Sequence, residues 1–292
     1  MKSRILCFGE MLWDIFPDGA VPGGAPMNVA ISLNKLGSDV FMLSSCGKDK
    51  HGENLLEYLR ENGLSTQFIQ QNNYPTGLVK VHLSEQKDAS YEIVFPSAWD
   101  YIKQVVELPE FDVLVYGSLS CRNKASFETL TGLLDASVLK VFDVNFRPPF
   151  VDQTIVEQLL KKSDIVKMNH EELFQLAAWN GLDSNDLELA ADLVFKNYSL
   201  KILCVTRGAK GAFLKTPDEK LYQNGFVVDT TDTVGAGDAF LAGFIHHYMD
   251  NKPLNDTLKF ACQLGAWVAS QKGANPHFIH QNIEKLSERT LN

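Results

Sequence analysis

The stretch Asp232-Thr233-Val234-Gly235-Ala236-Gly237-Asp238-Ala239-Phe240 decides how the rest of the chain is interpreted. Two glycines around one alanine allow a tight turn that leaves backbone N–H groups uncovered. The apolar run over residues 239–249 has the length and periodicity of a helix. We therefore expect the amides of Gly235, Ala236 and Gly237 to lie at a helix N-terminus, where the positive end of the helix dipole attracts an anion.

Asp238 ends this turn, and a carboxylate beside a bound phosphate is repelled by it. The residue makes chemical sense if its carboxylate takes a proton from a hydroxyl that attacks the phosphate. The alternative is that Asp238 is only a first-turn residue stabilised by the helix dipole, since Asp is common at that position. The pattern by itself leaves both interpretations open.

Composition narrows the class of protein. The 292 residues are 45% apolar, enough for one large core, and no linker divides them, so we expect a single domain over 1–292. The net charge of -9 opposes extended contact with nucleic acid or an anionic membrane, and favours a small-molecule partner. The five cysteines form no Cys-x-x-Cys pair, which favours a reducing, cytoplasmic location. We expect neither a signal peptide nor a membrane span.

Short apolar runs alternate with helical patterns along most of the chain. The expected strands cover 5–8, 40–43, 113–116, 141–144, 165–168 and 202–205. The expected helices cover 26–36, 53–61, 155–162, 187–195 and 239–249. This alternation predicts a three-layer α/β domain with a mostly parallel sheet.

One segment departs from the alternation. Residues 77–83 and 89–95 alternate like strands around the polar turn 84–88, with no crossover helix between them. Two interpretations are open: an edge hairpin of the main sheet, or a lid over a ligand cleft.

Polar residues and glycines follow the first expected strand. Asp14 is suited to accept hydrogen bonds from a polyol, because ligands of α/β sheets collect at the carboxyl ends of strands. Gly23 and Gly24 permit close backbone approach, and Asn28 can both donate and accept. An ordinary turn with a polar first-turn residue would give the same pattern.

Later strands end in the same way. Arg147 follows the strand at 141–144 and places a cation there. Asn169 and Glu172 join the next strand to a helix and are suited to a nucleotide phosphate or to water around magnesium. Thr206 and Gly208 lie in a turn after another strand. Each of these residues is weak evidence by itself. All of them follow expected strands, however, and this is the arrangement that one shared cleft would require.

Two segments resemble the signature regions of the ribokinase-type carbohydrate kinases, most closely the bacterial fructokinase branch. They are Gly-Gly-Ala-Pro-Met-Asn-Val-Ala at 23–30 and the stretch at 232–240. The resemblance covers nearly the whole chain in the right order. It implies a ribokinase-like fold with a small β lid, built mainly from 77–95 and from segments near 12–22. It also implies ATP-dependent phosphorylation of a primary hydroxyl.

The resemblance further implies a role for each candidate residue. Asp238 is the expected catalytic base, with the amides of Gly235, Ala236 and Gly237 as an anion hole. The other implied roles are sugar binding by Asp14, Gly24, Asn28 and Arg147, nucleotide binding by Asn169, Thr206, Gly208 and Cys262, proximity to Mg²⁺ for Glu172, and proximity to a monovalent cation such as K⁺ for Asp232 and Val234. A homodimer formed through the lid is also implied.

Fructose is the expected sugar. Arg147 is the one obvious cation for an acidic sugar, and Ser118 and Ser120 stand where some relatives have an acidic sugar ligand. Trp13 and Trp99 are suited to cover the apolar face of a hexose, or to fill the core. The alternatives are a kinase for another ketose, for 2-keto-3-deoxygluconate or for a nucleoside, and a noncatalytic sugar-binding regulator. Binding alone needs no base, so Asp238 disfavours the regulator.

Overall fold

The computed structural model describes residues 2–17, 19–83, 89–277, 282–283 and 285–287. Nine strands within them form one large sheet in the order β13-β12-β11-β10-β9-β8-β1-β4-β5. Along the chain these strands are β1 (Arg4–Phe8), β4 (Asp39–Gly47), β5 (Ile69–Asn72), β8 (Val113–Gly117), β9 (Leu139–Asp143), β10 (Ile165–Asn169), β11 (Ile202–Thr206), β12 (Ala212–Lys215) and β13 (Lys220–Gln223).

The pairs from β11 through to β5 are parallel, whereas β12 and β13 add an antiparallel edge. The mostly parallel sheet expected from the sequence is confirmed. Each of the six expected strands is present. The strands β5, β12 and β13 escaped the sequence analysis because they have only four residues each, and β5 is largely polar.

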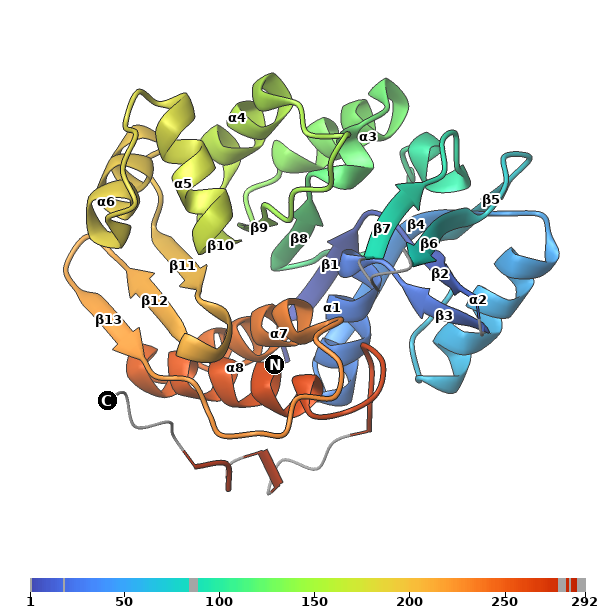
Figure 1. Ribbon diagram of the computed structural model, residues 1–292. Helices are drawn as coiled ribbons and strands as arrows, with labels where there is room; N and C mark the ends of the chain where they lie inside the picture. Colours follow the sequence, from blue (N-terminus) through green and yellow to red (C-terminus); the bar gives the residue numbers. More distant parts are fainter. Residues whose placement is uncertain (1, 18, 84–88, 278–281, 284, 288–292) are drawn as a thin grey trace.

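Helices cover both faces of the sheet and complete three layers (Figure 1). One face packs against α1 (Ala25–Lys35), α2 (Lys50–Glu61), α7 (Ala236–Met249) and α8 (Leu254–Ala269). The other packs against α3 (Lys124–Leu134), α4 (Gln153–Lys162), α5 (His170–Trp179) and α6 (Leu187–Asn197). Ile5 and Cys7 of β1 belong to the first core, and Leu6 and Phe8 to the second. A strand buried on both faces therefore reads as a continuous apolar run.

Local signals set where several helices begin. The Asp49 carboxylate accepts a hydrogen bond from the Gly52 amide at 2.8 Å and caps α2. Proline stands in the first turn of α1, where its missing N–H costs nothing. α7 begins at Ala236, earlier than the expected 239, because the glycine turn itself forms the first turn of the helix.

A separate four-stranded sheet stands beside α2 in the described chain (Figure 1). Its order is β3 (Gly19–Gly23), β2 (Leu12–Phe16), β6 (Gly77–Leu83) and β7 (Ala89–Ile93). The hairpin at 77–95 thus belongs to this small sheet and not to the edge of the large one, although its turn at 84–88 lies outside the described residues. The two other strands, β2 and β3, come from the segment that follows β1.

Candidate active site

The glycine turn forms the start of α7. Gly235 has φ 77°, in the left-handed region that favours glycine, and a Cβ there would lie 2.5 Å from the Ala274 Cβ. The Ala239 amide donates to the Gly235 carbonyl at 2.8 Å, and the Ala236 amide makes a long bond of 3.3 Å to the Thr233 carbonyl. The first amides of a helix have no intrahelical acceptor, so this turn can bind an anion once the long bond is given up.

Asp238 lies in this first turn and contacts α1. The Asn28 Nδ2 donates to the Asp238 Oδ2 at 2.8 Å, and the Asn28 Oδ1 accepts from the Asn275 Nδ2 at 2.8 Å. The second bond fixes the orientation of the Asn28 amide, so that its N–H groups face Asp238. One N–H of Asn28 then remains for another acceptor.

The surroundings of Asp238 favour its protonated form. Burial is the main cause that raises the pKa of Asp238, and the nearby Asp143 raises it further. Lys167, the bond from Asn28 and the charge of Arg147 act in the opposite direction. A carboxyl with a raised pKa is a better proton acceptor near neutral pH than an ordinary surface aspartate.

Asp14 reaches the same region from the small sheet. It lies within β2, opposite Val21 of β3, and not directly after a strand of the large sheet as the sequence analysis assumed. Burial raises the pKa of Asp14 to about 6, while Arg147 lowers it and Asp232 raises it. The three charged groups thus belong to one electrostatic environment, with Asp14 supplied by the small sheet. Its carboxylate fills the space beside Gly23 that a side chain there would need.

Gly24 lies between β3 of the small sheet and α1, and Arg147 lies in the loop after β9 of the large sheet. Gly24 precedes α1 with φ 114°, and a Cβ there would lie 2.6 Å from the Glu10 carbonyl oxygen. Arg147 is exposed, and its Nη1 donates to the Phe146 carbonyl at 3.0 Å.

Asn169 and Glu172 form a reciprocal cap at the start of α5. The Asn169 Oδ1 accepts from the Glu172 amide, and the Glu172 Oε2 accepts from the Asn169 amide, both at 2.8 Å. The Glu172 Oε1 also accepts from the Phe146 amide at 2.8 Å. Burial raises the pKa of Glu172, whereas Lys167 lowers it. These bonds lock the Glu172 carboxylate in place, and its remaining lone pairs are available to water.

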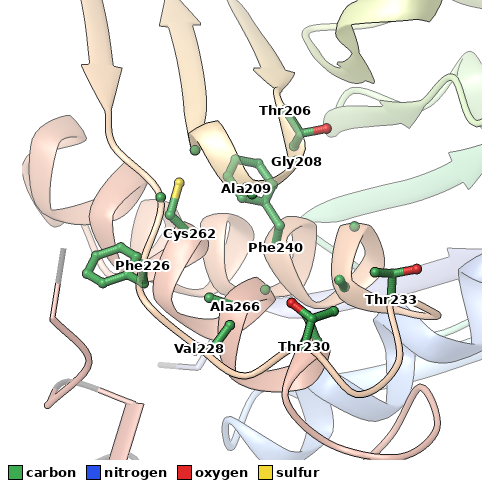
Figure 2. Close-up of a pocket in the computed structure, with 16 residues that line it drawn as sticks. Thr206, Gly208, Ala209, Phe226, Val228, Thr230, Thr233, Phe240, Cys262 and Ala266 are labelled. Atoms are coloured by element: carbon green, nitrogen blue, oxygen red, sulfur yellow. The ribbon is translucent and has the colours of Figure 1, made fainter. Parts of the chain in front are cut away.

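An apolar cavity of about 320 Å³ opens at the glycine turn (Figure 2). Thr206 lines it at the end of β11 and Gly208 just after this strand, while Cys262 lines it from α8 and Gly237 from α7. Other lining side chains include Phe226, Val228, Phe240 and Ala266. A flat aromatic group fits such a lining, with anionic groups extending to the amides of α7.

Asp232 joins two loops beside this cavity. Its Oδ1 accepts from the Val234 amide at 3.0 Å and its Oδ2 accepts from the Gly273 amide at 3.1 Å. Val234 is 41% exposed, and its apolar side chain has no atom that could bind a cation. A cation here would be bound by backbone carbonyl oxygens and by the outer lone pairs of Asp232. Among the described residues, no group of three or more His, Cys, Asp or Glu side chains is arranged to hold a metal ion.

The sequence analysis missed three buried charged groups at this site. The Lys167 Nζ contacts the Asp143 Oδ1 at 2.9 Å, and both side chains are at most 7% exposed. Glu10 is 2% exposed, and burial raises its pKa to about 7. A charged residue in or directly after an apolar strand was the available signal, since such residues are rarely buried without a partner or a function.

Two aromatic residues proposed as sugar contacts have different surroundings. Trp99 is fully buried, and the Arg122 guanidinium lies 3.9 Å from its ring centre, so it is a core residue. Trp13 is partly buried, and its Nε1 donates to the His51 carbonyl at 3.0 Å.

The comparisons with known proteins agree with this geometry. The model of the pfkB family of carbohydrate kinases matches residues 18–281. A probable fructokinase-4 from Arabidopsis thaliana is 32% identical, and the match covers 94% of this chain and 93% of the relative.

Solved structures are similar over the same extent. The ATP-bound fructokinase from Xylella fastidiosa has a TM-score of 0.83 at 25% identity, with 94% of each chain covered. A fructokinase from Vibrio cholerae O395, bound to fructose, ADP and a calcium ion, has a TM-score of 0.82 at 27% identity, also with 94% of each chain covered. Together with the fold and the glycine turn ending in Asp238, these matches place the chain in the pfkB family of carbohydrate kinases.

Proposed function

We propose that this kinase transfers the terminal phosphoryl group of ATP to a primary hydroxyl of fructose. The observation that carries the proposal is the position of Asp238, hydrogen-bonded to Asn28 at 2.8 Å, in the first turn of the helix that also lines the apolar cavity. The relatives bearing the name fructokinase support the choice of sugar.

Asp238 would act as the general base. Its carboxylate accepts the proton of the attacking hydroxyl, while the amides of Gly235, Ala236 and Gly237 stabilise the charge that develops on the transferred phosphoryl group. Asn28 orients the carboxylate through its fixed N–H group. The reaction then needs the hydroxyl and the phosphate to lie in line across the first turn of α7.

The sugar would lie between the small sheet and α1. In this proposal Asp14, Gly24, Asn28 and Arg147 bind its hydroxyls. Asp14 and the free N–H of Asn28 offer an acceptor and a donor, and Gly24 allows the backbone to come close. One arginine among these residues favours a neutral sugar over an acidic one.

The cavity at Cys262 suits the base and ribose of ATP, with Thr206 and Gly208 beside them and Asn169 near the phosphates. The donor set fits Mg²⁺, which is commonly held by one or two carboxylates, water and substrate phosphates; Glu172 would hold it through water. Bound there, Mg²⁺ would neutralise phosphate charge. The loop of Asp232 and Val234 would hold a monovalent cation such as K⁺ through its carbonyls.

The small sheet would act as a lid, and two lids would pair in a homodimer. Tyr91 on the outer strand β7 and Phe95 just after it are 61% and 52% exposed, and such aromatic residues are typical of interfaces. We further propose that residues 1–292 act as one kinase domain in the cytoplasm. No helix of the described chain is long and apolar enough to cross a membrane.

A substrate panel tests the proposed function. With ATP and Mg²⁺ fixed, kcat/KM for fructose is expected to exceed that for ribose, 2-keto-3-deoxygluconate and adenosine by at least about tenfold, or roughly 1.4 kcal/mol. A larger value for any of the three would change the substrate and leave the kinase in place. Absence of transfer to every sugar, with tight sugar binding by calorimetry, would support a noncatalytic regulator.

A further inference from the structure

A buried ion pair lies behind the glycine turn. Lys167 of β10 and Asp143 of β9 are direct partners in the register of two neighbouring parallel strands. The Lys167 Nζ contacts the Asp143 Oδ1 at 2.9 Å and Oδ2 at 3.1 Å, so one carboxylate accepts two of its three N–H groups. The third N–H group of the ammonium ion remains for another acceptor.

The pair points toward α7. Side chains two residues apart on a strand share a face, and Val141 and Ile165 belong to the core that α7 covers. A Cβ added to Gly237 would lie 3.1 Å from the Lys167 Nζ. The ammonium ion therefore fills the space that a side chain at Gly237 would take, directly under the amides of the anion hole.

The charges around Lys167 are unbalanced. It interacts electrostatically with three carboxylates, those of Asp143, Glu172 and Asp238, which gives one positive and three negative formal charges. Burial alone would lower the pKa of Lys167, but the three carboxylates raise it, so the side chain stays protonated. Without Lys167 the three carboxylates would have to lie together beside the phosphates of ATP.

Asp238 is surrounded by further charged and polar groups. Asn28 faces it from α1, Asp143 and Lys167 from the sheet, and Arg147 from the loop after β9. Glu10, which follows β1, also interacts with it electrostatically. Arg147 is exposed to solvent, which screens its charge, whereas Lys167 is buried and its field is screened little.

We propose that Lys167 is a positioning residue of the phosphoryl transfer, whose ammonium ion, held by Asp143 under Gly237, stabilises the ionised form of Asp238 against the effect of burial and favours the approach of phosphate to α7. This inference rests on the proposed function, because it requires Asp238 to act as the base. The competing explanation is that Lys167 only neutralises Asp143 within the core.

The test measures kcat/KM for the sugar against pH in Lys167→Met, at saturating Mg²⁺. We expect kcat/KM at pH 7 to fall by at least about tenfold. The acid limb of its pH profile, which reports the protonation of Asp238, should move to higher pH by about one unit or more, the usual effect of removing a close opposite charge. The titration of ATP is common to all variants and cancels in the comparison. The remote control is Lys215→Met, which removes a 2.8 Å ion pair with Asp192 and should leave the limb in place.

A double variant separates electrostatics from packing. Lys167→Met combined with Asp143→Asn restores the formal charge around Asp238 to its original value, so the acid limb should return to within about half a pH unit of the wild type. If Lys167→Met fails to fold, the test rests on Asp143→Asn alone. Removal of this negative charge should move the acid limb of kcat/KM to lower pH.

Two results would overturn the role of Lys167. One is an acid limb at its original pH in folded Lys167→Met, whatever its activity or stability. The other is an unmoved limb in Asp143→Asn. A wild type that phosphorylates no sugar would instead refute the proposed function, and this is seen before any variant is compared.

Discussion

The replacement Asp238→Asn tests the proposed chemistry most directly, because it removes the proposed base and keeps the shape of the side chain. The Asn28 N–H that bonds the Asp238 Oδ2 at 2.8 Å finds a carbonyl oxygen of the new amide in its place. The raised pKa of Asp238 means that the folded protein disfavours its ionised form, chiefly because the group is buried. Loss of that charge should therefore leave the melting temperature unchanged or raise it.

The expected loss of turnover in Asp238→Asn follows from the proposed role of Asp238 as general base. A positioned general base contributes about 10²–10⁴-fold, or roughly 2.7–5.5 kcal/mol of transition-state stabilisation. The cavity at Cys262 is untouched, so the Kd for ATP should change by less than about threefold. kcat is measured by ADP release, Kd by calorimetry, and folding by thermal denaturation.

The reasoning would be refuted by turnover within about tenfold of the wild type in a variant that folds and binds ATP normally. A strongly lowered melting temperature would also contradict it, since it would mean that the charge of Asp238 stabilises the fold.

Three further outcomes are expected. Cys262→Phe should fill part of the 320 Å³ cavity and raise the KM for ATP at least about tenfold with the sugar KM unchanged, whereas Cys262→Ala should change neither. Arg122→Met leaves Asp100 buried without its 2.7 Å partner and should cost about 3–5 kcal/mol of unfolding free energy in urea, against less than about 1 kcal/mol for the exposed Lys50→Met. The pKa of Asp14 is raised to about 6, so the sugar KM should increase as pH falls through that value and this dependence should vanish in Asp14→Asn. A KM that stays flat with pH in the wild type would remove Asp14 from the sugar site.

The sequence by itself determined the layers of the large sheet and the presence of a helix at the glycine turn. Both depend on local patterns: apolar runs that alternate with amphipathic segments, and glycines that permit φ 77° at Gly235. The predicted three-layer fold and mostly parallel sheet were confirmed for this reason. The sequence did not reveal the antiparallel edge, because strands of four residues carry too short a pattern and depend on their neighbours for pairing.

Only the tertiary structure decided which side chains meet. Asn28 and Asp238 are 210 positions apart in the chain and share a hydrogen bond because α1 and α7 pack on the same face of the sheet. Lys167 faces Asp143 because β10 pairs with β9 in one particular register, and Asp14 reaches the site through a second sheet. Strand order and register arise from burial over the whole domain, so no local stretch of sequence contains them.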